Sequence, residues 1–229
     1  FGFTSINEIK IPKTIEKIQK ETFYKCKQLK KVMFSKSSKL KSIGKKAFNF
    51  TSLASISIPP QVKIIDDSCF SFCEELNSIE FSINSELKEI GIGAFYFTPI
   101  KRIAIPSSVV EIRENAFSDS ELECIQFSED SKINVFEKET FSSSSLKRIV
   151  IPASVKMINQ SCFASCADLF TVEFLGIKIK IDECCFSDSK QLMIVSLPNI
   201  QLCQIEENAF DGVYEDFSLF IPKSAILQI

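Results

Sequence analysis

The nine cysteines are the side chains of this chain best suited to chemistry, as nucleophiles, metal ligands or disulfide partners. Six of them fall at two recurring positions, either directly before a phenylalanine or three residues after one. The first group is Cys69, Cys162 and Cys185, and the second is Cys26, Cys73 and Cys166. Other segments carry alanine at the first position, and a cysteine that replaces alanine behaves as a small buried apolar group. We therefore expect these thiols to be structural.

Disulfides and metal sites are the alternatives for these thiols. Cys69 and Cys73 are four residues apart around one bend, as are Cys162 and Cys166, so a local disulfide in either pair remains open. Zinc requires four converging Cys or His ligands, and the chain has no histidine. We expect no metal site and no cofactor.

The other three cysteines follow no such rule. Cys124 falls at an outward position on a predicted strand and is expected to be an exposed thiol. Cys184 and Cys203 match no recurring position.

Catalytic constellations are missing from the sequence. Without histidine the chain lacks the commonest general base and every Ser-His or Cys-His nucleophile pair. Its six glycines form no phosphate-binding loop. The carboxylate pairs 66–67 and 206–207 fall in polar turn segments, where solvated side chains are the ordinary interpretation. We predict that this chain is not an enzyme.

Composition and charge argue against two classes of partner, nucleic acids and membranes. The chain has 229 residues, 45% of them hydrophobic, and a formal net charge of -2, with lysines and acids interspersed. No basic stripe is present to neutralise nucleic-acid phosphates, and no run of 18 apolar residues that could enter a membrane. The sequence opens with 1–3, Phe-Gly-Phe, without an initiator Met, so we expect it to be a fragment of a longer chain.

A phenylalanine recurs at intervals of 22 to 25 residues along the whole chain. Its nine members are Phe23, Phe48, Phe70, Phe95, Phe117, Phe141, Phe163, Phe186 and Phe210. Five residues before each stands a large apolar residue, which is isoleucine in every case except Phe136. After each bend the sequence alternates apolar and polar residues, as in Arg102 to Ile105, which is typical of a short half-buried strand.

A longer period overlies the first. Proline ends every second strand, at Pro12, Pro59, Pro106, Pro152 and Pro198. Three of the alternate repeats end in Phe-Ser instead and carry an extra turn, as in residues 82–85. Since proline donates no ladder hydrogen bond, it terminates each strand that it follows.

These recurring positions predict the fold. One repeat cannot bury its apolar face alone, whereas stacked repeats bury a continuous core with the phenylalanines as its spine. We predict an α/β-type but β-rich leucine-rich repeat solenoid, a right-handed coil of about nine repeats of 22–25 residues with a parallel sheet on one face. Residues 1–229 form a single domain, and 217–229 are expected to cap its end.

The unit I-x-I-P-x-x-V-x-x-I-x-x-x-A-F-x-x-C-x-x-L, which runs from Ile103 to Phe117 and again from Ile149 to Phe163, resembles the BspA-like leucine-rich repeats. The resemblance covers essentially the whole chain. It implies a surface or secreted protein of a bacterium or parasitic protist, with a role in adhesion. It is specific for the repeat and says little about the ligand.

The outward positions of the strands are the expected contact face of such a coil. The predicted binding face consists of Lys31, Met33, Glu80, Arg102, Gln126, Arg148, Val150 and Glu173. The plainer interpretation is a surface ladder in which the arginines pair with the glutamates one strand away. The functional interpretation is a polar patch centred on Arg102, Gln126 and Arg148, because arginine is favoured at interface hot spots.

We interpret the chain as a non-catalytic repeat module that binds other proteins, such as host or matrix proteins. A cell-surface or secreted adhesion protein is the first hypothesis, and a cytoplasmic protein–protein interaction scaffold of the same fold is the alternative. We expect no nucleic-acid partner and no membrane insertion by this segment, and the oligomeric state stays open. Asn49 and Asn159 head N-x-S/T triplets that could carry glycans on a secreted protein.

Overall fold

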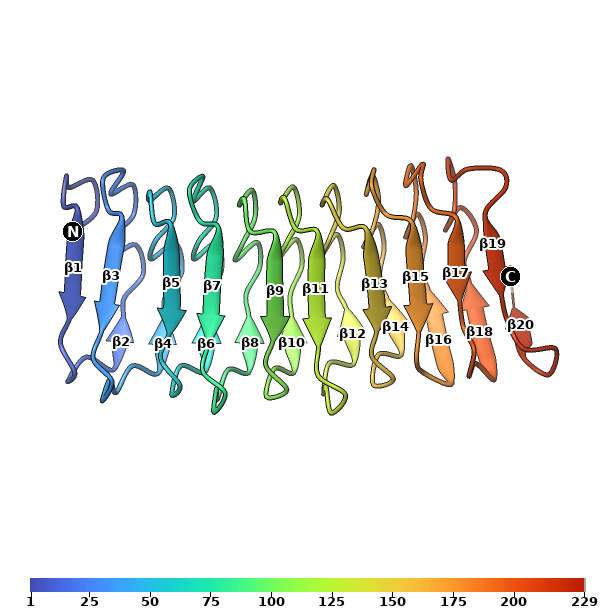
Figure 1. Ribbon diagram of the computed structural model, residues 1–229, viewed down its shortest axis with the longest axis horizontal. Coiled ribbons are helices and arrows are strands. Elements are labelled where there is room, and N and C mark those ends of the chain that lie inside the picture. The colour runs from blue at the N-terminus through green and yellow to red at the C-terminus, as the bar shows by residue number, and fades with distance from the viewer. Residues whose placement is uncertain (229) are drawn as a thin grey trace.

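The computed structural model describes residues 1–228, and they form an elongated β-solenoid of about ten turns. Each turn contributes one strand to each of two columns that run along the length of the molecule, with the two termini at opposite ends (Figure 1). No helix occurs between residues 1 and 228. The structure confirms the predicted repeat solenoid and adds a second column of short strands on the far side of the core.

The odd-numbered strands form the first column. They are β1 (Glu8–Ile11), β3 (Lys31–Phe34), β5 (Ser55–Ile58), β7 (Ser78–Phe81), β9 (Arg102–Ile105), β11 (Cys124–Phe127), β13 (Arg148–Ile151), β15 (Thr171–Phe174), β17 (Ile194–Ser196) and β19 (Ser218–Phe220). Their pairing is parallel, and equivalent repeat positions lie side by side, as Ile56 does with Ile79. In β5 and β9 exposed and buried residues alternate, as the sequence pattern predicts.

The even-numbered strands form the second column, behind the first in Figure 1. They are β2 (Lys17–Ile18), β4 (Ser42–Ile43), β6 (Ile64–Ile65), β8 (Glu89–Ile90), β10 (Glu111–Ile112), β12 (Val135–Phe136), β14 (Met157–Ile158), β16 (Lys178–Ile181), β18 (Leu202–Ile205) and β20 (Ile226–Gln228). Each of the first seven spans only two residues and ends in the recurring isoleucine, or in Phe136. That residue is buried in every one of these seven strands, so the column closes the core from behind.

A stack of phenylalanine rings runs through the core. All nine recurring phenylalanines belong to it, with neighbouring ring centroids 5.1–5.7 Å apart and interplanar angles of 4–12°. Phe1 stacks on Phe23 at one end and Phe217 on Phe210 at the other. We call these eleven rings the phenylalanine spine. The nine inner members are predicted from the sequence. Of the two end rings, Phe1 also fits the repeat spacing, 22 residues before Phe23, whereas Phe217, seven residues after Phe210, does not.

The bends that carry the spine are tied to one another by backbone hydrogen bonds. The amide of each inner phenylalanine from Phe23 to Phe186 donates to the carbonyl of the residue just before the next phenylalanine, at 2.8–2.9 Å. The residues two before and two after each of the nine phenylalanines have φ between 51° and 70°. This left-handed geometry turns the chain sharply enough to bring successive bends within hydrogen-bonding distance.

The ladder of each column is interrupted at defined places, which we call seams. In the odd column, hydrogen-bonded pairing is absent between β3 and β5, between β7 and β9 and between β11 and β13 of the described chain. Every strand before such a seam belongs to a Phe-Ser repeat, whose extra turn closes through a hydrogen bond such as Ser85 N to Ser82 O at 2.9 Å. In β15, Phe174 is followed by a short connection instead, and β15 pairs with β17. The extra turn and the interrupted pairing therefore occur together.

The even column has one seam within residues 1–228, between β10 and β12. It falls at the one repeat whose recurring isoleucine is replaced by phenylalanine. The Phe136 ring is fully buried and meets the spine edge-on, with its centroid 5.4 Å from that of Phe141 and 6.3 Å from that of Phe163. Because interiors are close-packed, a ring in a space sized for isoleucine moves the backbone around it. We attribute the seam to this substitution.

Removing a ring from the spine tests how much the stack contributes. Phe95→Ala is expected to lower the free energy of unfolding by about 3–5 kcal/mol, since Phe95 is fully buried and stacked on both sides. Ile83→Ala is the matched control, because Ile83 is 99% exposed, and should change stability by under about 0.5 kcal/mol. Urea denaturation followed by circular dichroism measures both. Equal effects of the two substitutions would contradict the spine's role.

Candidate functional site

The eight residues of the predicted binding face all lie on odd strands, at the first or third position, and point away from the core. Lys31 and Met33 lie on β3, Glu80 on β7, Arg102 on β9, Gln126 on β11, Arg148 and Val150 on β13 and Glu173 on β15. Lys31, Glu80, Arg102, Gln126 and Arg148 are exposed, and the other three are half-buried. The strand register thus places them where the alternation predicts.

Only part of the predicted arginine–glutamate ladder forms. Arg148 donates from Nη2 to Oε2 of Glu173 at 2.8 Å, across one strand. Glu80 instead accepts a hydrogen bond from Ser57 Oγ at 2.9 Å, and Arg102 has no ion pair among residues 1–228. The exposed Arg148 pair contributes under about 1 kcal/mol.

A hollow of about 560 Å³ lies on this face at the seam between β11 and β13. We call it the seam hollow, and it is lined by Cys124, Ile125, Gln126, Phe127, Ser128, Glu129, Arg148, Val150, Pro152, Ala153 and Leu175. It brings together three residues of the predicted face, Gln126, Arg148 and Val150. The other five, at 31, 33, 80, 102 and 173, do not line it. Sequence reasoning did not foresee the hollow, although the extra Ser-containing turn after Phe127 marks its position.

The segments just before the two strands of this seam are joined by a backbone hydrogen bond, from Lys147 N to Glu123 O at 3.3 Å, and by charged side chains. Lys147 donates from Nζ to Oε2 of Glu123 at 2.8 Å, which joins the segment before β13 to the segment before β11. This hydrogen bond and the lysine's charge lower the pKa of Glu123. The Lys147–Glu123 pair therefore joins β11 and β13 at their beginnings, and the seam hollow lies further along the two strands.

The seam hollow suits binding better than catalysis. Its lining combines the apolar side chains of Phe127, Val150 and Leu175 with the polar ends of Gln126 and Arg148. In the part of the chain from 1 to 228, no three His, Cys, Asp or Glu side chains converge on a point that could hold a metal ion. An apolar centre with a polar rim is the usual composition of a protein–protein contact.

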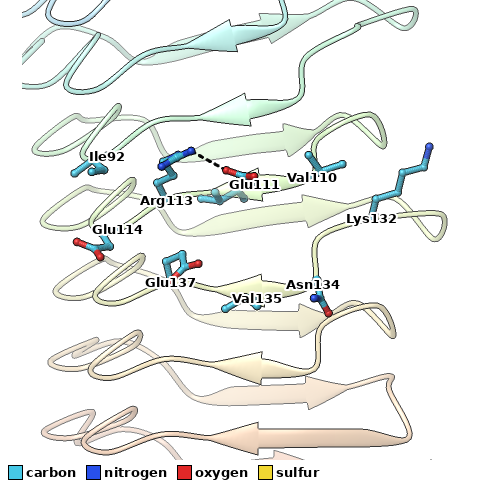
Figure 2. A pocket seen from close by; sticks show the side chains of 10 residues that line it. Ile92, Val110, Glu111, Arg113, Glu114, Lys132, Asn134, Val135 and Glu137 are labelled. Atoms are coloured by element: carbon cyan, nitrogen blue, oxygen red, sulfur yellow. Dashed lines mark hydrogen bonds and ion pairs between the residues drawn. The ribbon is translucent and has the colours of Figure 1, made fainter.

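A second hollow, of about 540 Å³, lies on the opposite face at the seam between β10 and β12 (Figure 2). Ile92, Val110 and Val135 give it an apolar surface, and Arg113 lies along its wall. The Arg113 guanidinium contacts Glu89 at 2.7 Å and Glu111 at 3.0 Å, so its charge is already compensated. Phe136 lies on β12 between two lining residues, Val135 and Glu137, but does not line the hollow itself.

All nine cysteines are free thiols, and seven of them are buried. Cys69, Cys162 and Cys185 fill the small position before the phenylalanine. Cys26, Cys73 and Cys166 are more than apolar filler, because each thiol donates to a spine carbonyl of the preceding turn, at 3.0–3.2 Å. Ser189 takes the same role, with Oγ donating to Phe163 O at 2.7 Å, whereas the hydroxyls at this position in three other repeats donate to the phenylalanine carbonyl of their own turn. The local disulfides left open by the sequence are absent.

The structure also locates the other three cysteines and the two asparagines of the N-x-S/T triplets. Cys124 is half-exposed in the seam hollow, and Cys184 is half-exposed at a bend position with a φ of 52°. Cys203 lies buried on β18, beside Ile179. Asn49 is 3% exposed and donates to Ser68 O, whereas Asn159 donates to Glu137 Oε2 at 2.8 Å. A glycan on Asn49 would require that bend to open.

Comparisons with known proteins agree with this architecture. The model of the BspA type leucine rich repeat region matches in six copies, over residues 1–123, 77–193 and 134–227. A search of the curated proteins finds no match. No helix among residues 1–228 is both long and apolar enough to cross a membrane.

Several solved structures share the fold at low sequence identity. The pneumococcal vaccine antigen PcpA superposes with a TM-score of 0.60 at 20% identity, over 96% of this chain and 73% of that one. A leucine-rich repeat protein from Bacteroides ovatus gives 0.58 at 21%, over 97% and 74%. A leucine rich cell surface protein from Faecalibacterium prausnitzii gives 0.52 at 22%, over 96% and 74%. These similarities show the fold alone.

The buried thiols predict how stability depends on pH. Burial raises the pKa of Cys73 and Cys166 to about 11, from a reference of 9.0. As the pH rises past about 9, the unfolded chain loses these protons while the folded chain keeps them, so stability falls until the folded thiols titrate near pH 11. We expect a loss of roughly 2–3 kcal/mol per thiol over that window.

Urea unfolding at pH 7.5 and pH 10.5 measures this loss. The variant carrying Cys73→Ser and Cys166→Ser is the matched comparison, because serine already occupies this position in other repeats and does not titrate there. It should lose less stability than the parent between the two pH values. An identical loss in both proteins would show that these thiols do not contribute.

Proposed function

Because the chain belongs to the BspA-type leucine-rich repeat family, we propose that it is a non-catalytic adhesion module that binds another protein from the cell surface or in secreted form. The family and the similar structures support the general part of this statement, a repeat module for protein interaction. The adhesive role, the surface location and the residues that make the contact are our proposal.

The seam hollow is the observation that carries the proposal. It is the hollow of the odd-strand face in which Gln126, Arg148 and Val150 meet apolar side chains. Arginine is over-represented at the centres of protein interfaces, and the exposed Arg148 guanidinium can leave its half-buried partner Glu173 at little cost. We assign the partner to host or matrix proteins and the contact to the strand face around this hollow.

The surface location draws support from the structural neighbours. One of them is described as a vaccine antigen and another as a cell surface protein. Antibody labelling of intact source cells, lost after mild surface proteolysis, is the expected result. Labelling only after permeabilisation would contradict the surface location.

An intracellular scaffold of the same fold is the second candidate. The observation in its favour is the set of nine free thiols, since disulfides are common in secreted proteins and rare in reducing compartments. The same labelling experiment decides between the two locations, because a scaffold is reached by antibody only in permeabilised cells.

Binding of the purified chain to immobilised extracellular-matrix proteins tests the contact face. The double variant Arg148→Glu with Val150→Asp should weaken binding at least about tenfold. The first change reverses the charge of residue 148, and the second puts a carboxylate in the apolar part of the seam hollow. Lys17→Glu makes a lysine-to-acid change at an exposed position of β2, on the opposite face, and should bind as the parent does. Equal losses in both variants, or no loss in either, would contradict a contact at this face.

A further inference from the structure

The position two residues after each inner phenylalanine changes character along the coil. In the first half of the chain it holds Lys25 and then three phenylalanines, Phe50, Phe72 and Phe97. In the second half it holds polar residues or glycine, namely Asp119, Ser143, Ser165, Asp188 and Gly212. The position has positive φ in all nine repeats, so the backbone requirement is the same throughout.

Phenylalanine is a poor choice for this backbone. Phe50, Phe72 and Phe97 have φ of 57°, 58° and 53°, where a bulky side chain crowds the following carbonyl at a cost of roughly 1–2 kcal/mol each. The rings do not enter the core: Phe50 and Phe72 stack on each other at 4.7 Å, and Phe97 is 48% exposed. Of the three rings, Phe97 is therefore the one that presents an aromatic face to solvent.

Lys25 shows what such rings bind within the chain itself. Its ammonium lies 5.2 Å from the ring centroid of Tyr24, 5.6 Å from that of Phe50 and 5.7 Å from that of Phe3. These are cation–π distances to three rings at once. The first aromatic group along this edge is therefore occupied by a cation from its own repeat.

Within residues 1–228, the second aromatic group has no such cation. Tyr96 and Phe97 occupy the positions that Tyr24 and Lys25 occupy in the first repeat, and both rings lie near Phe72, at 5.3 and 5.6 Å. Beside Phe97 is a hollow of about 420 Å³, which we call the bend-edge hollow. It is lined by Glu74, Phe97, Thr98, Pro99, Asp119, Ser120, Glu121, Ser143 and Ser145.

The bend-edge hollow carries uncompensated negative charge. Glu74, Asp119 and Glu121 are exposed, and its lining includes no lysine or arginine. None of the three carboxylates takes part in an ion pair within residues 1–228, although many acids of this chain do. Asp119 accepts a hydrogen bond from Ser118 Oγ at 2.9 Å, which does not neutralise its charge. An exposed aromatic face beside carboxylates without an ion pair is complementary to a guanidinium, which stacks on rings and pairs with carboxylates.

We propose that the bend-edge hollow receives an arginine side chain from a basic segment of a partner protein. The guanidinium stacks on Phe97 and pairs with Asp119 and Glu121, as Lys25 occupies the neighbouring rings within the chain. This surface lies along the bends and shares no lining residue with the seam hollow, so it extends the proposed function to a second contact.

A fluorescein-labelled peptide, acetyl-Gly-Arg-Gly-Arg-Gly-amide, is the probe, and its citrulline counterpart is the neutral control. Fluorescence anisotropy with the whole chain should show saturable binding of the arginine peptide alone. Phe97→Ser should weaken it about fivefold through loss of the ring, and Asp119→Asn by a similar factor. Serine is the residue at the same position in two later repeats, so Phe97→Ser is compatible with the bend.

Asp188→Asn is the matched control, since Asp188 occupies the same position as Asp119 but has no aromatic neighbours in its column. It should leave binding unchanged. Equal binding of the arginine and citrulline peptides overturns the proposal. So does an Asp188→Asn effect as large as that of Asp119→Asn, or a Phe97→Ser variant that binds as the parent does.

Discussion

The stacking of one phenylalanine on the next, turn after turn, is the contact on which the rest of this structure depends. Each ring lies 5.0–5.7 Å from its neighbours, close to the separation of adjacent strands in a sheet. The backbone amide of each inner phenylalanine from Phe23 to Phe186 also donates a hydrogen bond to the next bend. Side-chain packing and backbone pairing therefore impose one common rise on every repeat. The requirement for a small residue before each phenylalanine, and for left-handed φ two residues to either side, follows from this close approach of the bends.

A scaffold this regular makes its departures from regularity informative. Phe136 replaces an isoleucine and coincides with the seam and hollow between β10 and β12. The extra turn after Phe127 accompanies the seam hollow on the other face. Phe97, at a strained bend position, borders the bend-edge hollow. In each case a residue that fits the repeat less well opens or lines a surface. Such sites are where a repeat scaffold can acquire a ligand without losing its core.

The sequence predicts the columns because apolar spacing determines which side chains face inward. The phenylalanine spine, the half-buried strands and the outward position of residues such as Arg148 all follow from spacing alone. Phe1 lies 22 residues before Phe23 and so fits the spacing, whereas Phe217 lies only seven residues after Phe210, so no periodicity could reveal that last ring. Arg102 lacks the expected glutamate partner because Glu80 bonds to Ser57, and such a choice among several polar neighbours depends on three-dimensional geometry. The seams escape prediction for the same reason, since a parallel ladder can be lost while the strand pattern stays intact.

Amide hydrogen exchange along the native chain tests the central claim most directly, that the bonded spine is the continuous rigid element and that the ladder is interrupted at the seams. The account predicts the slowest exchange at the bend amides, such as those of Phe48, Phe95 and Phe163. It predicts exchange at least about tenfold faster for residues 134–137, beside the β10–β12 seam, than for residues 178–181 in the paired part of the same column. Uniform protection across the seam, or bend amides that exchange faster than the strands, would contradict it.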